Sequence, residues 1–190
     1  MNTRNFSTAR MLAAVGMFAA LTLLATSVLR IPTPVFGYIH IGDGFVLLAG
    51  FLLGPVYGGL AAGIGSALSD FLAGYVIWAP GSFVIKFLTA AAAAVVYSHL
   101  RRAGRMHRNG GVFLLAAVTG ELIMTAGYFL YNILIVSISA GTAEAGLAAA
   151  AAVSLSEIPF NLIQGGAGIL LAAVLYPIFS RNLIRTFLPG

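Results

Sequence analysis

The sequence predicts an all-α membrane protein, folded as a bundle of six transmembrane helices. Hydrophobic residues make up 60% of the 190 residues and charged residues only 8%, and the mean hydropathy is +1.00. A soluble domain has about 25% charged residues, so this chain cannot cover itself with a hydrated surface. Several apolar runs also approach the roughly 20 residues that cross a bilayer as a helix. The length and the lack of an internal repeat indicate one transmembrane domain, residues 1–190.

Proline and glycine signals divide the chain into its expected spans. Pro32 and Pro34 end the first span, because each proline removes a backbone donor and biases the preceding residue toward extended geometry. A loop then runs to about Ile41, and Gly54-Pro55 is a turn signal between the second and third spans. A polar loop is expected over Ser139–Gly146. The expected spans are Ala9–Val28, Gly44–Leu53, Val56–Leu72, Ser82–Leu100, Val112–Ser137 and Ala150–Phe179.

The arginines favour six spans rather than five. With six spans, both termini and the basic loop after the fourth span lie on one side of the membrane. Cytoplasmic segments carry an excess of Lys and Arg, so both termini are expected in the cytoplasm, in the plasma membrane of a prokaryote. Eight of the ten cationic residues then share that side: Arg4, Arg10, Arg101, Arg102, Arg105, Arg108, Arg181 and Arg185.

Polar residues within the spans point to a binding site in the outer half of the membrane. Glu157, Asn161 and Gln164 follow a helical i, i+4, i+7 row, and a second row, Glu121, Thr125, Tyr128 and Asn132, follows the fifth span. Polar rows in lipid must face the interior of a bundle. Amides, a carboxylate and aromatic rings suit a neutral heteroaromatic molecule with hydroxyl groups. The predicted substrate-binding residues are Glu157, Asn161, Gln164, Asn132, Tyr128, Lys86, Trp78 and His40.

Structural interpretations compete with this site. Asp43 precedes an apolar run and is expected to cap that helix. Asp70 and Lys86 are expected at similar depth and could neutralise each other, and Trp78, with Tyr75, could belong to an aromatic belt at the interface. Whether Glu121, expected near mid-membrane, is protonated or paired stays open.

The first span carries a different pattern. Ala9, Ala13, Gly16 and Ala20 are spaced by four, three and four residues, which makes one smooth face of a helix. Small residues at this spacing let helices approach closely. The row is either internal packing or a docking face for another membrane subunit.

Several classes of chemistry find no support in the sequence. There is no G-x-x-x-x-G-K-[ST] motif for ATP, no H-E-x-x-H motif and no cysteine. The three histidines lie at expected membrane edges, so no serine has an evident base. We therefore expect no catalytic residues, no metal, no cofactor and no nucleic-acid partner, and the protein is not expected to be an enzyme.

Two stretches resemble a known family. GYIHIGDGFVLLAGFLLGPVYGG and SALSDFLAGYVIWAPGSFVIKF resemble the substrate-binding (S) components of energy-coupling factor (ECF) vitamin transporters, of the riboflavin type and the hydroxymethylpyrimidine or pyridoxine type. Gly16-x-x-x-Ala20 resembles the family's A-x-x-x-A contact with the transmembrane coupling subunit, with glycine in place of the first alanine.

The resemblance implies a binding subunit that captures a vitamin from outside and delivers it through a coupling (T) subunit and two cytoplasmic ATPases. A B6 vitamer or hydroxymethylpyrimidine is the expected ligand, and riboflavin comes next. Two alternatives from other classes are a self-sufficient small secondary transporter or channel, and an intramembrane enzyme. The lack of an internal repeat disfavours the first, and the lack of a placed nucleophile and base disfavours the second.

Overall fold

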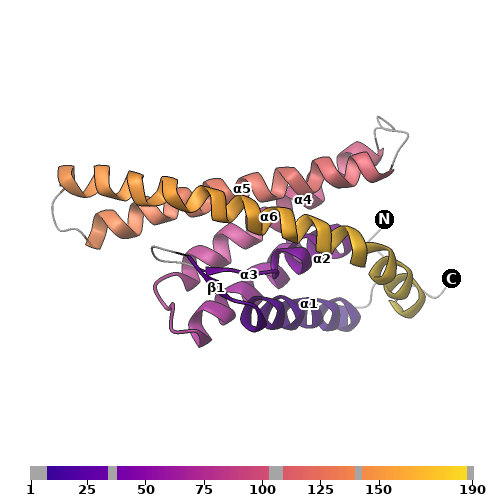
Figure 1. Cartoon of the computed structure of the whole chain (residues 1–190). Helices are drawn as coiled ribbons and strands as arrows, with labels where there is room; N and C mark the ends of the chain where they lie inside the picture. Colours follow the sequence, from indigo (N-terminus) through magenta and orange to yellow (C-terminus); the bar gives the residue numbers. More distant parts are fainter. Residues whose placement is uncertain (1–7, 34–37, 103–108, 140–142, 188–190) are drawn as a thin grey trace.

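The computed structural model describes residues 8–33, 38–102, 109–139 and 143–187. Within these ranges the chain forms a six-helix bundle with one small two-stranded sheet, as Figure 1 shows. This confirms the all-α bundle that the sequence predicts. The elements are α1 (Thr8–Val28), β1 (Ile31–Pro32), β2 (Tyr38–Ile39), α2 (Asp43–Leu53), α3 (Pro55–Leu72), α4 (Ala79–Arg102), α5 (Asn109–Ser139) and α6 (Ala143–Phe187).

Four of the described helices are long and apolar enough to cross a membrane: α1, α4, α5 and α6. Helix α2 is apolar but has only 11 residues, a length of about 16 Å at ~1.5 Å per residue. It therefore does not reach across a hydrocarbon core of about 30 Å by itself. The second expected span is thus a helix, but shorter than a bilayer is thick.

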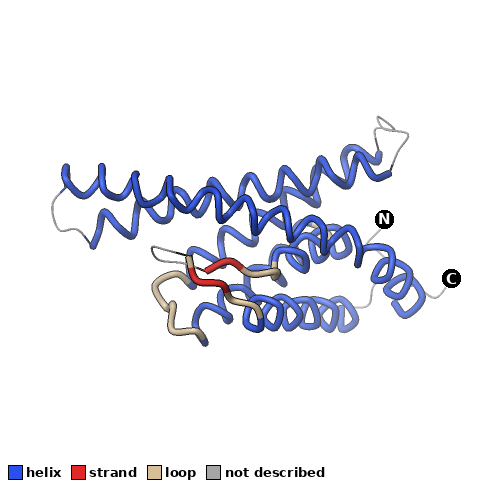
Figure 2. Tube along the Cα trace, viewed as in Figure 1, coloured by secondary structure: helices blue, strands red, loops and turns tan. Residues whose placement is uncertain are grey.

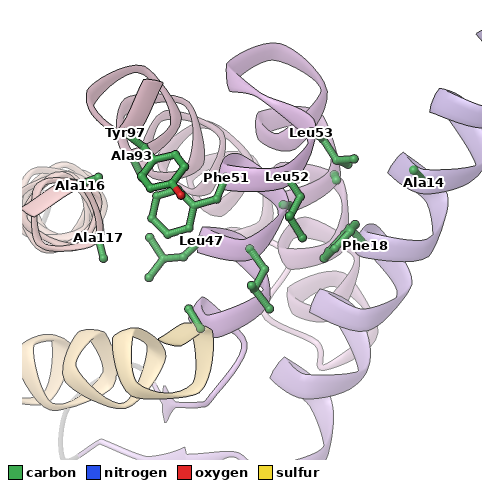
Figure 3. Packing of buried hydrophobic residues seen from close by; sticks show 14 of the residues in the cluster. Ala14, Phe18, Leu47, Phe51, Leu52, Leu53, Ala93, Tyr97, Ala116 and Ala117 are labelled. Atoms are coloured by element: carbon green, nitrogen blue, oxygen red, sulfur yellow. The ribbon is translucent and has the colours of Figure 1, made fainter. Parts of the chain in front are cut away.

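Helix α2 forms the centre of the bundle. Ten of its 11 residues are buried, and it packs against α1, α3, α4 and α6. Phe51 of α2 contacts the rings of Tyr97 and Phe113, and Leu52 lies toward Phe18 of α1 (Figure 3). The outer helices surround this core: α5 packs between α4 and α6, and α3 between α1 and α4.

Glycines permit the closest helix approaches. A Cβ placed on Gly58 of α3 would overlap the backbone of Ala49, and one on Gly65 would overlap the carbonyl oxygen of Ala19. The glycines of α3 therefore let its backbone touch α2 and α1.

The connection between α1 and α2 differs from the expected loop. Ile31 pairs with Ile39 and Pro32 with Tyr38 in a short antiparallel hairpin, drawn in red in Figure 2 beyond the C-terminal end of α1. Prolines tolerate such an edge position because the missing N–H faces no partner.

The last helix also differs from expectation. Helix α6 has 45 residues and continues through Pro159 and Pro177. It begins at Ala143, inside the loop expected over Ser139–Gly146, of which residues 140–142 lie outside the described ranges. The N-terminus of α1 and the C-terminus of α6 lie toward the same end of the bundle (Figure 1).

Candidate functional site

A pocket of about 70 Å³ lies between the hairpin and the helices beside it. The hairpin and the residues after it contribute Thr33, Tyr38 and His40. The segment from the end of α3 to the start of α4 supplies another wall, and α5 and α6 provide the opposite one. The lining residues are Thr33, Tyr38, His40, Asp70, Tyr75, Trp78, Ser82, Tyr128, Asn132, Glu157, Asn161 and Gln164.

Helical periodicity brings the polar groups of α5 and α6 to this pocket. The α6 row of Glu157, Asn161 and Gln164 lines the pocket over two helical turns. Tyr128 and Asn132 of α5 line it over one turn. Their side chains face the interior of the bundle, which is where polar groups of lipid-embedded helices must point. The α6 row and the outer half of the α5 row therefore converge on one cavity, whereas Glu121 and Thr125 do not line it.

The structure gathers seven of the eight predicted site residues around the pocket and leaves out Lys86. Five other residues of the lining were not among the predicted site residues. Tyr38 and Tyr75 could have been recognised as binding residues, because they are amphipathic aromatic residues close to the end of a span. Asp70 could have been recognised because charged residues are rare in this chain. Nothing in the sequence marked Thr33 and Ser82 as binding residues, because small hydroxyl residues are common in membrane proteins. These five residues are Thr33, Tyr38, Asp70, Tyr75 and Ser82.

Lys86 belongs instead to a fully buried polar cluster behind the pocket. Its Nζ donates to Asp43 Oδ1 at 2.5 Å, and both side chains are completely buried. Gln164 Nε2 donates to Asp43 Oδ2 at 2.7 Å, while its Oε1 accepts from the His40 backbone N–H at 3.1 Å. Gln164 thereby connects the pocket wall to the cluster of Asp43, Lys86 and Gln164, which we call the buried triad.

The buried triad corrects two expectations. Asp43 does not cap α2: the N-cap is Gly42, with no side-chain capping bond. Lys86 has its salt bridge with Asp43 and not with Asp70. A lysine inside a bundle requires a buried carboxylate at hydrogen-bonding distance, and Asp43 provides one from the neighbouring helix α2.

Asp70 holds the hairpin over the pocket. The Tyr38 hydroxyl donates to Asp70 Oδ1 at 2.6 Å, and the Arg30 guanidinium lies 5.2 Å from the centre of the Tyr38 ring. Arg30 also donates to the hydroxyl of Ser69 at 3.0 Å. Burial and the Asp70 carboxylate raise the pKa of Tyr38, so its hydroxyl stays protonated and remains a donor.

His40 lines the pocket as a neutral ring. Its Nδ1 accepts a hydrogen bond from the Gly42 backbone N–H at 3.0 Å, so this nitrogen carries no proton and any ring N–H is on Nε2. Burial lowers the pKa of His40 to about 4; the positive charges of Lys86 and Arg30 add to this effect, and Asp43 opposes it.

The pocket offers hydrogen-bonding groups that the protein does not use. Glu157 is buried, and its Oε1 has no hydrogen-bond partner in the described part of the chain. The described residues contain no group of three or more His, Cys, Asp or Glu side chains that could hold a metal ion. The lining of rings, amides, hydroxyls and two carboxyls, those of Asp70 and Glu157, is suited to recognising a polar aromatic molecule.

The small-residue row of the first span lies on the opposite side of α1 from the core. Ala9, Ala13, Gly16 and Ala20 are all exposed, and a Cβ built on Gly16 meets no atom within 4 Å. The interpretation of this row as packing inside the bundle is therefore wrong. The row forms an open, flat surface.

Comparison with known families identifies the protein class. The family model described as "ECF-type riboflavin transporter, S component" matches residues 5–181. The chain belongs to this S-component family. The match covers almost the whole chain, so the fold, the pocket and the exposed face of α1 all fall within it, and the protein is a membrane protein.

A solved structure and a curated relative extend this result. The chain resembles a structure titled "Structure and mechanism of the S component of a bacterial ECF transporter", with a TM-score of 0.64, 20% identity, and coverage of 93% of this chain and 99% of that one. At this identity the likeness shows the fold. A protein of Pyrococcus woesei, described as "Uncharacterized protein in gap 3'region", is 37% identical over 106 residues. That match spans 55% of this chain and 66% of the relative, just under two thirds of its length.

Proposed function

We propose that this S component is the membrane-embedded binding subunit of an ECF transporter and captures a small heteroaromatic vitamin from outside the cell. The observation that carries the proposal is the pocket itself, where rings, amides and the partnerless Glu157 oxygen converge at one end of a membrane bundle. The proposed role is binding rather than catalysis, because among the described residues the Ser82 hydroxyl pairs with that of Tyr128 and His40 Nδ1 accepts from the Gly42 N–H, so the two do not form a nucleophile and base pair.

The ligand class follows from the pocket lining. Tyr75 and Trp78 supply aromatic surface, and Asn132 and Asn161 supply amides that both donate and accept. The pocket is small, which favours a one-ring vitamin such as a B6 vitamer or hydroxymethylpyrimidine. Riboflavin is the next candidate, and the description of the matching family names it.

Transport requires partners in this proposal. The coupling subunit docks on the exposed row of Ala9, Ala13, Gly16 and Ala20, and two cytoplasmic ATPases supply energy. Both termini lie in the cytoplasm of a prokaryotic cell, with the pocket opening outward. This orientation places eight of the ten cationic residues inside. Labelling of a cysteine at Asn109 by an impermeant reagent from outside the cell would contradict it.

Titration calorimetry of the purified chain tests the proposal. Riboflavin, pyridoxine and hydroxymethylpyrimidine are the probes, and one of them is expected to bind tightly to the chain alone. Uptake of that probe is expected only when the coupling subunit and both ATPases are present. Absence of binding for all three probes would overturn the ligand class. Uptake by the chain alone would instead make it a transporter in its own right.

A further inference from the structure

A second cavity, of about 190 Å³, lies along the seam between α5 and α6. It is larger than the 70 Å³ of the outer pocket. Glu121 and Thr125 of α5 reach it from one side and Gly165 of α6 from the other, and much of the remaining wall is aliphatic, including Leu122, Leu162 and Ile169.

Two polar side chains of this cavity, those of Glu121 and Thr125, have no hydrogen-bond partner in the described part of the chain. Glu121 is only 6% exposed, and neither of its carboxyl oxygens has a hydrogen-bond partner among the described residues. The hydroxyl of Thr125, 9% exposed, has none there either. A buried polar group without a hydrogen bond is costly, and a carboxyl inside a membrane is especially so. Such groups are retained where something outside the chain uses them.

The cavity borders the outer pocket. Asn161 lines both spaces. On α5 the row of four polar residues divides between them: Glu121 and Thr125 line the inner cavity, while Tyr128 and Asn132 line the outer pocket. Thr125 and Tyr128 are three residues apart, so about 4.5 Å of helix separates the two groups. One ligand is long enough to touch both.

We propose that Glu121 and Thr125 form an inner subsite that binds a hydroxyl-bearing part of the ligand held in the outer pocket. The inference rests on the proposed function, since it assumes a heteroaromatic vitamin there. A ligand O–H donates to a carboxyl oxygen of Glu121 and accepts from the Thr125 hydroxyl, while the aliphatic walls contact its carbon atoms. A neutral hydroxyl fits this wall better than a cation, because it adds no charge to be desolvated.

The glycines of α6 keep the subsite open. A Cβ on Gly165 would lie 3.1 Å from both the Cβ and the Oε2 of Glu121, whereas a Cβ on the adjacent Gly166 would meet nothing within 4 Å. Gly165→Ala should therefore press on the carboxyl that takes the ligand. Because Gly166 also lines the cavity, the control is Gly110→Ala on α5, where an added Cβ likewise meets nothing within 4 Å.

Paired probes test the inner subsite in the purified full-length chain. The pairs are pyridoxine with 4-deoxypyridoxine and riboflavin with lumiflavin, in which the second member lacks one hydroxyl or the hydroxylated chain. Glu121→Met and Thr125→Val should each weaken binding of the hydroxylated member about tenfold or more and leave its partner nearly unchanged. Glu121→Gln, which keeps a carbonyl acceptor, should retain most of the affinity. Thr119→Val is the control, because that hydroxyl donates to the Leu115 carbonyl on the same helix.

Thermal unfolding of the ligand-free variants separates this role from a structural one. Removing a lone buried carboxyl should raise the melting temperature of Glu121→Met while its affinity falls. A lowered melting temperature with equal loss for both members of a pair would overturn the inner subsite. So would unchanged affinity in Glu121→Met and Thr125→Val when Asn161→Ala still weakens binding, and that result would leave the proposed function intact. Absence of binding of every probe to the wild-type chain would instead overturn the proposed function itself.

Discussion

Two polar regions of this bundle are built in opposite ways. In the buried triad, Asp43 accepts from both Lys86 and Gln164, and each carboxylate oxygen has a donor. Along the seam of α5 and α6, Glu121 and one oxygen of Glu157 have no partner in the described part of the chain. Both regions are buried in a protein with few charged residues.

This difference indicates that the polar groups of the triad stabilise the fold, whereas those of the seam serve a ligand. A satisfied ion pair joins α2 to α4, and its amide neighbour extends the connection to α6, so the triad holds the core together. Among the described residues, neither the Glu121 carboxyl nor Glu157 Oε1 joins two helices by a hydrogen bond. These buried carboxyls lower the stability of the ligand-free protein, and their presence is explained if a bound ligand forms hydrogen bonds with them.

The largest expected effect on the isolated protein comes from breaking the triad. Lys86→Met leaves the Asp43 carboxylate buried without its cation, which should cost about 3–5 kcal/mol of stability. Chaotrope or thermal unfolding in detergent measures this loss. The double variant with Asp43→Leu should recover part of it, because no lone charge remains. A loss below about 1 kcal/mol in Lys86→Met would mean that the triad is not a structural centre.

Changes in the pocket should affect binding more than stability. Asn161→Ala and Glu157→Gln each remove a group that we assign to the ligand, so each should weaken vitamin binding about tenfold or more. Melting temperatures should stay near that of the wild type. Leu170→Ala, at an exposed residue of α6 that lines neither cavity, is the control and should change neither. Unchanged affinity in both pocket variants would move the ligand away from α6.

His40 should give a smaller, pH-dependent effect. Its pKa is about 4 in the folded protein against an ordinary value of 6.5. Between these two values the unfolded chain binds a proton on His40 and the folded protein does not. The free energy of unfolding should therefore fall as the pH drops from about 6.5 to about 4. Near pH 8 the ring is almost entirely neutral in both states, so it adds almost no pH dependence to the stability. Melting curves of His40→Gln should lack this part of the pH dependence; an identical slope would contradict the neutral ring.

Much of the fold was predictable because it follows local rules. The apolar runs and Gly54-Pro55 predicted α2 and α3 to within one residue at each end, and helical spacing brought Asn161, Gln164 and Tyr128 to one cavity. The partner of Lys86 was not predictable. Asp43 and Asp70 were both plausible by depth, and only the packing of α2 against α4 decides between them. The strand pairing of Ile31 with Ile39 likewise depends on contacts that no local pattern contains.

The exposed row on α1 should give the smallest effect on the isolated protein. Gly16→Leu and Ala20→Leu place bulk where the bundle has open surface, so binding and melting temperature should stay nearly unchanged. Uptake with the coupling subunit and ATPases should nevertheless be abolished, because a bulky side chain holds a partner helix away. Ala14→Leu, at a fully buried position on the same helix, should instead destabilise the protein. Normal uptake by Gly16→Leu and Ala20→Leu would remove the docking role from this surface.

The most direct test of the account is mass spectrometry of the small molecules that copurify with the protein. In this account, the polar groups of the pocket bind a heteroaromatic vitamin. The wild-type chain should therefore carry one such vitamin in near-stoichiometric amount, and the Asn161→Ala, Glu157→Gln double variant should be depleted of it at equal thermal stability. Equal retention of the vitamin by both proteins, or a folded wild type that carries none and binds none when it is added, would contradict the account.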